Sequence, residues 1–476
     1  MMNFGRFIEG GFEDKGGELK VLDPDDDSVA GTVRTCGAND VNNAIAYAEK
    51  TFRTFSKIPM CDRLAMLEKA AVLIESRLEE FADCIRREAG KPIMLCRLEV
   101  KRAADTIRMT IHSASELNGE YRNMDCHAQG KGFLGIVGRF PVGPIAAITP
   151  FNFPLNLAIH KIAPALAAGC SVIHKPARKT PLSAHMLAKT FEEAGLPSGA
   201  YQITVAEPQS AELLARDNRI KLLTFTGSAL VGHHLKSLSI DKKIVLELGG
   251  NAAVIVEDDA DLKNAARQIA IGAFTYAGQV CISVQRILVS KKIYEPFRKL
   301  LIQATAENAI VGRTADPKVI VGPMISSTEA DRVNSWVDEA VKSGAVSLTG
   351  RSWDKNIIHP VLLENVDEKA KVMREEAFGP VACVIPYDSL DEAIKVVNDS
   401  KYGLQAGIFT SSINKAFYAF QNLEVGGVIV NDVPTRRLDH MPYGGVKGSG
   451  EGREGPAYAL RHMTEERVML IKQGNP

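Results

Sequence analysis

Hydrophobic side chains in the first quarter of the chain recur at the three- and four-residue spacing of an amphipathic helix. The pattern begins near Asp62 and includes Leu64, Leu67, Ala71, Ile74, Leu78, Phe81 and Ile85. This spacing predicts one long helix, which Gly90-Lys91-Pro92 ends. A second helical pattern follows to about Leu117, whereas residues 1–40 contain short strand-like pieces broken by turn-forming residues.

From Pro144 onward, apolar runs of strand length alternate with helical patterns. The runs are residues 145–149, 171–174, 201–205, 221–225 and 244–246, and a second series includes 252–256 and 286–289. Helices are predicted between them, ending at 168 and spanning 181–194 and 261–274. Strands separated by helices of this length form a parallel sheet covered on both faces, so an α/β fold is predicted. Such sheets bind ligands at the carboxyl ends of their strands.

The composition limits the classes of function. A chain of 476 residues exceeds what one hydrophobic core serves, so two or three domains are expected. Lys plus Arg and Asp plus Glu both number 57, so no overall charge favours nucleic acid or an anionic membrane as a partner. No apolar run approaches the length of about 20 residues that a membrane helix needs.

The cysteines and histidines predict no metal site. Eight cysteines are scattered without a CxxC pair, and the ten histidines show no ligand spacing. Reduced thiols in a cytoplasmic protein are the simplest interpretation. Residues 1–17 lack the apolar core of a signal peptide, which agrees with that localisation.

One stretch, residues 245–283, carries a candidate pair of catalytic groups. It opens with Glu247-Leu248-Gly249-Gly250-Asn251 and closes with Gly278-Gln279-Val280-Cys281. A cysteine that attacks a carbonyl carbon leads to a thioester, and cleaving it with water needs a carboxylate that accepts a proton. Glycines beside both residues let the backbone, a cofactor and a substrate approach closely.

These two motifs together resemble the signature of the NAD(P)-dependent aldehyde dehydrogenases, and the resemblance extends from about Pro141 to Arg453. It implies an α/β aldehyde dehydrogenase fold with two Rossmann-like parallel-sheet domains and a small β extension for oligomerisation. The cofactor-binding domain would comprise residues 1–120 and 142–246, and the catalytic domain residues 247–440. Segments 121–141 and 456–476 would form the extension, because the strand-like stretches 130–142 and 458–472 lack partners in either α/β series. We therefore expect a homodimer or homotetramer, in which a partner chain covers the exposed strand edge.

The resemblance also implies catalytic roles. Cys281 would attack the aldehyde carbon to give a thiohemiacetal, hydride would pass to the nicotinamide, and Glu247 would activate the water that hydrolyses the thioester. Asn152, within Pro150-Phe151-Asn152-Phe153-Pro154, would form an oxyanion hole with the backbone N–H of Cys281. Two structural alternatives are a cysteine that only packs and an asparagine that caps the following helix.

Cofactor contacts are expected from several motifs. Lys175 matches a family lysine that reaches the adenosine ribose, and Glu376 and Phe378 lie in an E-E-x-F-G-P element that would hold the nicotinamide ribose. A strand-to-helix turn with G-x-x-x-x-G spacing would place a helix N-terminus at the pyrophosphate. The remaining predicted contacts are Thr226, Gly227, Ser228 and Gly232 of that turn, with Pro150, Phe151 and Leu248 beside the catalytic residues.

Arg178 departs from the pattern of NAD-preferring members, which have an acidic residue at this place. A guanidinium pairs well with phosphate, so we predict that NADP is accepted as well as NAD and is preferred if Arg178 meets the 2′-phosphate. The alternative is an arginine that points to solvent beside an NAD site.

The substrate is expected to be a small hydroxylated or anionic aldehyde. Arg437, within Thr435-Arg436-Arg437-Leu438-Asp439-His440, could meet a carboxylate, phosphate or hydroxyl group, and Arg102 is a second candidate. The region looks most like the lactaldehyde and non-phosphorylating glyceraldehyde-3-phosphate branch, and succinate-semialdehyde and phosphonoacetaldehyde enzymes share much of it. Val280 replaces a phosphate-binding arginine of some relatives, which disfavours glyceraldehyde 3-phosphate.

Two other classes of function compete with this reading. A protein that keeps the fold only for binding would not need Cys281, Glu247, Asn152 and Lys175 together. An enzyme that passes the acyl group to coenzyme A typically lacks the glutamate at 247, so its presence favours release of a free acid.

Overall fold

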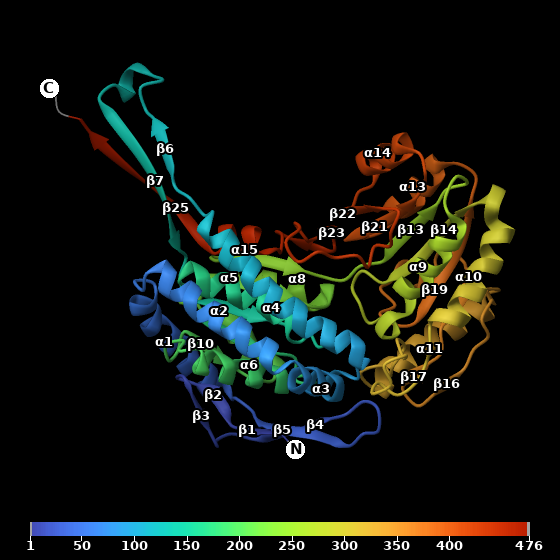
Figure 1. Ribbon diagram of the computed structural model, residues 1–476, viewed down its shortest axis with the longest axis horizontal. Coiled ribbons are helices and arrows are strands. Elements are labelled where there is room, and N and C mark those ends of the chain that lie inside the picture. The colour runs from blue at the N-terminus through green and yellow to red at the C-terminus, as the bar shows by residue number, and fades with distance from the viewer. Residues whose placement is uncertain (1, 474–476) are drawn as a thin grey trace.

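The computed structural model describes residues 2–473 and contains two α/β units side by side, with a β arm that projects from one of them (Figure 1). Residue 1 of the predicted segment 1–120 and residues 474–476 of the predicted segment 456–476 lie outside the described residues. The predicted α/β class is confirmed, because parallel strands dominate both large sheets. Within residues 2–473, each helix is too short or too polar to span a lipid bilayer.

The N-terminal region contributes short strands and four helices. Strands β1 (Met2–Phe4), β5 (Val29–Arg34) and β4 (Glu18–Leu22) form a small sheet, and β2 (Arg6–Ile8) pairs with β3 (Gly11–Glu13). The helices are α1 (Ala38–Phe55), α2 (Met60–Ser76), α3 (Leu78–Ala89) and α4 (Ile93–Ser115). The single helix predicted from Asp62 to Ile85 is wrong, because the backbone leaves helical geometry at Arg77 (φ −109°, ψ 26°). The apolar spacing crosses this break because α2 and α3 bury their apolar faces in the same core.

The first large sheet has the strand order β10-β9-β8-β11-β12-β24. Its strands are β8 (Ile145–Ile148), β9 (Val172–Lys175), β10 (Tyr201–Ile203), β11 (Leu222–Thr226), β12 (Lys243–Glu247) and the antiparallel edge strand β24 (Gly450–Glu451). Helices α5 (Asn156–Ala168), α6 (Leu182–Glu193), α7 (Pro208–Arg216) and α8 (Ala229–Leu238) connect them. Parallel pairing aligns Thr226 with Glu247 and Ile148 with Lys175, so the predicted site residues gather at one edge of the sheet.

The second large sheet has the order β15-β18-β19-β14-β13-β21-β22. Its strands are β13 (Ala252–Val256), β14 (Val284–Ser290), β15 (Val346–Ser347), β18 (Val361–Glu364), β19 (Val381–Tyr387), β21 (Gln405–Phe409) and β22 (Gly427–Val430). The associated helices are α9 (Leu262–Phe274), α10 (Tyr294–Asn308), α11 (Ser327–Lys342), α12 (Lys371–Arg374), α13 (Leu390–Asn398) and α14 (Ile413–Asn422). Two short pairs, β16 (Trp353–Asp354) with β17 (Ile357–Ile358) and β20 (Tyr402–Gly403) with β23 (Val446–Lys447), complete this part.

The projecting arm is a three-stranded antiparallel sheet in the order β25-β7-β6 (Figure 1). It consists of β6 (Glu120–Asn123), β7 (Phe133–Pro141) and β25 (Thr464–Lys472), so the two unplaced stretches pair with each other. The strand predicted for 458–472 is wrong at its start, because α15 (Pro456–His462) precedes β25 and packs against α5 and α4. That packing buries Leu460. A buried leucine is compatible with a helix or a strand, so the apolar pattern alone did not separate the two.

Candidate active site

Cys281 lies in a loop between the 3₁₀ turn η2 (Thr275–Gly278) and β14. Tyr276 and Ala277 have positive φ angles of 55° and 52°, a conformation that costs on the order of 1–3 kcal/mol for each non-glycine residue. Gln279 holds this turn, because its amide donates to the Tyr276 carbonyl (3.3 Å) and accepts from the Ile325 N–H (2.9 Å). The loop geometry is therefore set by specific hydrogen bonds rather than by local preference.

The thiol of Cys281 is protonated at neutral pH in this structure. Burial raises the pKa of the Cys281 thiol to about 12, although a hydrogen bond from Tyr443 and the charge of Arg437 oppose that shift. The sulfur lies 3.0 Å from the Tyr443 hydroxyl. Tyr443 follows the Arg437 loop in the stretch Met-Pro-Tyr-Gly-Gly and was not predicted as a site residue, because the sequence alone does not reveal which side chain contacts the sulfur.

Asn152 lies beside the Cys281 loop. Its side-chain amide donates to the backbone carbonyl of Gln279 (2.9 Å), and its oxygen has no partner among the described residues. An asparagine amide carries two N–H donors, so one remains for a ligand. The alternative role as a helix cap is not realised, since the side chain of Glu99 accepts the N–H groups of Leu155 and Asn156 at the start of α5.

Glu247 ends β12 and faces the same small region as Cys281. A Cβ at Gly250 would lie 2.5 Å from the Cys281 carbonyl oxygen, and a Cβ at Gly444 would lie 2.8 Å from Glu247 Oε1. Gly444 follows Tyr443, which contacts the sulfur. The structure thus brings the two motifs together. Burial raises the pKa of Glu247 well above its usual range, and neither carboxylate oxygen has a partner within residues 2–473.

A buried charge cluster that the sequence did not reveal surrounds Glu454. Lys161 forms an ion pair with it, and Arg437 Nη2 lies 3.1 Å from its other oxygen. The hydroxyl group of Thr226, a predicted cofactor contact, donates to Glu454 (3.3 Å). The Arg437 guanidinium lies 3.8 Å from the ring centre of Tyr443. The Tyr443 side chain therefore links Arg437 to the sulfur of Cys281. The sequence did contain a sign of this cluster, because Asn156, His160 and Lys161 interrupt the apolar run of α5.

A second buried carboxylate, Asp439, holds the other predicted substrate residue. Arg102 contacts both of its oxygens (2.9 and 2.7 Å). His160 Nε2 lies 2.9 Å from Asp439, and Asn156 donates to it (3.2 Å). Although burial opposes it, the hydrogen bonds from His160 and Arg102 lower the pKa of Asp439 far below its usual range. Arg102 therefore reaches this cluster as an ion-pair partner, a contact that joins positions too distant in sequence to be foreseen.

The residues predicted for the nicotinamide half of the cofactor also gather here. The ring of Phe378 packs edge-to-face against Phe151 (5.9 Å between centroids), which follows Pro150. Glu376 accepts the N–H of Gly250 (3.0 Å), and burial raises the pKa of its carboxyl group to about 7. A carboxyl group held beside the nucleophile loop is a suitable acceptor for ribose hydroxyls.

The residues predicted for the adenosine half lie at the ends of β9 and β11. Lys175 is half-buried, and desolvation lowers the pKa of its amine to about 8. Its amine donates to the backbone carbonyl of Pro176 over 3.4 Å. Arg178 forms an ion pair with Glu207, so its guanidinium is already partnered. Glu207 thus places an acidic group beside Arg178 that the sequence motifs did not predict.

The turn into α8 combines packing with an exposed apolar surface. Ser228 is the N-cap of α8 and follows Gly227, and a Cβ at Gly232 would lie 2.3 Å from Leu248, so Gly232 permits close packing on β12. Leu230 in the first turn is 83% exposed. An apolar side chain beside a helix N-terminus suits an adenine ring next to phosphates, so these residues fit a dinucleotide.

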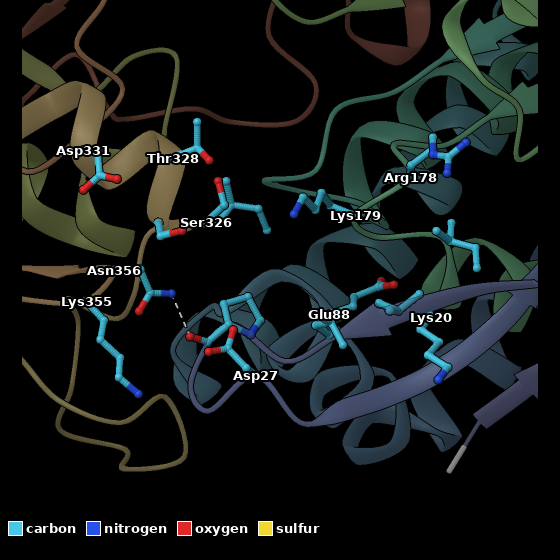
Figure 2. A pocket seen from close by; sticks show the side chains of 16 residues that line it. Lys20, Asp27, Glu88, Arg178, Lys179, Ser326, Thr328, Asp331, Lys355 and Asn356 are labelled. Carbon is cyan, nitrogen blue, oxygen red and sulfur yellow. Dashed lines mark hydrogen bonds between the residues drawn. The ribbon is translucent and has the colours of Figure 1, made fainter.

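A cavity of about 730 Å³ lies between β4 and the start of α11 (Figure 2). Arg178 and Lys179 line it from the side of the first sheet, and Ser326 and Asp331 line it from the second unit. None of Cys281, Glu247 and Asn152 lines it. The cavity is therefore separate from the reactive groups.

Comparisons with known proteins agree with this geometry. The profile of the aldehyde dehydrogenase family matches residues 12–469. A 3-sulfolactaldehyde dehydrogenase from Priestia megaterium is 44% identical over 470 residues, which are 98% of each chain. A lactaldehyde dehydrogenase from Methanococcus maripaludis is 36% identical over 95% of this chain and 97% of the relative. An NADP-dependent glyceraldehyde-3-phosphate dehydrogenase from Bacillus halodurans, solved with NADP, superposes with a TM-score of 0.97 at 34% identity and covers 100% of both chains.

Proposed function

The chain belongs to the aldehyde dehydrogenase family, and from that premise we propose that it oxidises a small hydroxylated or anionic aldehyde, such as lactaldehyde, to the carboxylic acid. It is an oxidoreductase of class EC 1.2.1, and its cofactor is NADP or NAD. The two relatives are named for 3-sulfolactaldehyde and lactaldehyde. Both compounds carry a hydroxyl group on carbon 2, the carbon bonded to the aldehyde carbon.

The observation that carries the proposal is the balance of buried charge around Cys281. Three cations (Lys161, Arg437 and Arg102) face two carboxylates (Glu454 and Asp439). Burial raises the pKa of Glu247 and lowers that of His160, so burial disfavours the charged form of both. The five groups in these ion pairs are three cations and two carboxylates, and an anionic group on the substrate would balance the difference. The Nε of Arg437 has no partner among the described residues and could meet that group.

The proposed reaction uses three side chains. The thiol proton of Cys281 passes to solvent and the sulfur adds to the aldehyde carbon, while the free N–H of Asn152 stabilises the oxyanion of the thiohemiacetal. NADP or NAD, when bound beside Glu376 and Phe378, supplies the hydride acceptor. Glu247, once ionised, takes a proton from water, and the water oxygen attacks the thioester carbon. The carbon–sulfur bond then breaks, the carboxylic acid is released, and the proton held by Glu247 restores the Cys281 thiol.

A substrate panel tests this function by NAD(P)H absorbance. It contains 3-sulfolactaldehyde, lactaldehyde, glyceraldehyde 3-phosphate, succinate semialdehyde, phosphonoacetaldehyde and propanal, each with NADP and NAD and with or without coenzyme A. We expect kcat/KM for a hydroxylated or anionic aldehyde to exceed that for propanal by about tenfold or more, which corresponds to about 1.4 kcal/mol. Highest activity on propanal, or a requirement for coenzyme A, would contradict the proposal.

Cofactor preference follows from the state of Arg178. Its guanidinium forms an exposed ion pair with Glu207, and a 2′-phosphate could replace Glu207 as its partner at small cost in free energy. We propose that NADP is accepted alongside NAD. The same panel measures this ratio, and a strong NAD preference would show that Arg178 stays with Glu207.

We propose a homodimer or a dimer of dimers as the assembly. β25 is an edge strand of the arm, and Val468, Met469 and Leu470 on it are each more than half exposed. Such an edge is protected when another chain covers it. Light scattering at micromolar concentration tests this, and a monomer would contradict it.

A further inference from the structure

Lys91 and Glu99 form a buried ion pair that the proposed reaction does not use. Lys91 lies between α3 and α4, Glu99 lies on α4, and both side chains are fully buried. Apolar side chains of similar volume often stabilise a protein core as well as a buried ion pair does, so stability alone does not explain this pair. Its contacts instead connect the Asn152 loop (residues 149–155) with the Cys281 loop (residues 275–283).

The ammonium group of Lys91 contacts one aromatic ring from each loop. Its Nζ lies 3.5 Å from the ring centre of Phe153 and 4.9 Å from that of Tyr276. The two rings also pack edge-to-face, with 6.4 Å between their centres. A desolvated cation is attracted by the negative face of an aromatic ring, so these contacts restrain both rings. Phe153 directly follows Asn152, and Tyr276 lies in the turn that leads to Cys281.

Hydrogen bonds attach both loops to the same part of the molecule. The Tyr276 hydroxyl donates to the backbone carbonyl of Ala89 (2.8 Å), two residues before the lysine of the pair. Glu99 Oε1 accepts the N–H groups of Leu155 and Asn156 (3.0 and 3.1 Å), where the Asn152 loop enters α5. The ion pair therefore joins the end of one loop to the beginning of the other.

The separation of the two loops matters for the oxyanion. Asn152 Nδ2 donates to the backbone carbonyl of Gln279 in the Cys281 loop (2.9 Å), so a shift of either loop moves the amide relative to the sulfur. Tyr276 has a positive φ of 55°, a conformation that persists only when its surroundings support it. In such sites a displacement of about 1 Å can lower the rate by about 100-fold.

We propose that Lys91 and Glu99 are positioning residues, which hold the Asn152 loop and the Cys281 loop at the separation that the oxyanion hole needs. The inference rests on the proposed aldehyde oxidation and deepens it. Neither residue touches the sulfur, so both act through the two loops.

The double variant Lys91→Met/Glu99→Gln tests this role in the full-length enzyme. It removes both buried charges at similar volume, and the glutamine oxygen can still accept the N–H groups at the start of α5. We expect kcat/KM for the best aldehyde of the panel to fall by about 10- to 100-fold. Phe153→Leu removes the ring and leaves the ion pair intact, so it should cause a smaller loss of the same kind.

Alkylation of Cys281 by iodoacetamide distinguishes positioning from a general disturbance of the site. The sulfur displaces iodide in this reaction, and no oxyanion forms. The rate, followed on the Cys281 peptide by mass spectrometry, should therefore stay within about twofold of the wild type in both variants. A fall in this rate as large as the fall in kcat/KM would overturn the inference, because the thiol itself would then be displaced.

A double-mutant cycle with Asn152→Ala tests whether the ion pair acts through the oxyanion hole. Adding the double variant to Asn152→Ala should lower kcat/KM by no more than about twofold further, because the donor is already absent. The matched control is Glu88→Gln, which changes a buried carboxyl group that accepts the N–H groups of Leu182 and Ser183 at the start of α6. It should keep kcat/KM within about twofold of the wild type.

Three results would overturn the inference: unchanged kcat/KM in Phe153→Leu and in the double variant, losses that multiply in the cycle, or an equal loss in Glu88→Gln. If the double variant does not fold, Phe153→Leu and its own cycle with Asn152→Ala decide the question. Full activity of Asn152→Ala alone would instead refute the oxyanion hole of the proposed function, so the two failures are distinguishable.

Discussion

The surroundings of Glu247 and of Glu454 shift the pKa values of two buried carboxyl groups beside the first sheet in opposite directions. Glu454, just after β24, lies against Lys161 and Arg437, which lower the pKa of its carboxyl group despite burial. Glu247, at the end of the neighbouring strand β12, has no such partner, and burial raises the pKa of its carboxyl group. The difference shows that burial alone does not set the protonation state of a carboxyl group, because adjacent cations can reverse its effect.

The opposite pKa shifts suit two different roles. Glu454 in its ionised form binds Lys161 and Arg437, whereas burial favours the protonated form of Glu247 until water or substrate enters and the carboxyl group can ionise. Two carboxyl groups whose environments push their pKa values apart are typical of sites that need one fixed charge and one proton acceptor.

The largest expected effect comes from removing the proton acceptor. Glu247→Gln should lower kcat by about 10²- to 10⁴-fold, the usual contribution of a general base, while acylation of Cys281 continues. Mass spectrometry after mixing with aldehyde and cofactor should then detect a thioester on Cys281. Full steady-state turnover in this variant would remove Glu247 from the proposed mechanism.

Breaking the Glu454 pair should affect stability most. Lys161→Met leaves a buried carboxylate without its main partner, which costs about 3–5 kcal/mol in free energy of unfolding by urea. Adding Glu454→Gln should recover part of that loss, because the uncompensated charge is then removed. The control is Lys371→Met, which breaks an exposed pair with Glu339 and should have little effect. Equal losses in Lys161→Met and Lys371→Met would contradict the comparison.

The smallest expected effect is a dependence of stability on pH. The folded state holds the Glu247 proton above pH 4.5, where the unfolded chain has begun to lose it. Stability from this group is therefore complete at low pH and is lost as pH rises through the folded pKa, by up to about 1.4 kcal/mol per pH unit. Urea titrations at about pH 6 and pH 8 should show Glu247→Gln gaining stability relative to the wild type at the higher pH. A constant difference would mean that Glu247 is ionised in the folded state.

Local patterns predicted much of the fold and the identity of the reactive groups. The alternation of apolar runs and helical segments predicted the strands from β8 to β14 to within two residues at each end, because burial on both faces of a parallel sheet leaves a continuous apolar run. The same logic failed at Arg77 and at α15. A helix break inside one apolar face, and a short helix before a strand, do not change the spacing of buried positions.

The sequence by itself determined which residues could react, since Cys281, Glu247 and Asn152 stand in recognisable motifs. Only the tertiary structure decided their surroundings: the hydroxyl of Tyr443 at the sulfur, the binding of Arg102 by Asp439, and the pairing of Arg178 with Glu207. Desolvation and Coulomb interactions depend on distance in space, and these partners are separated along the chain by tens to hundreds of residues. The charge state of each buried group is therefore a property of the folded molecule.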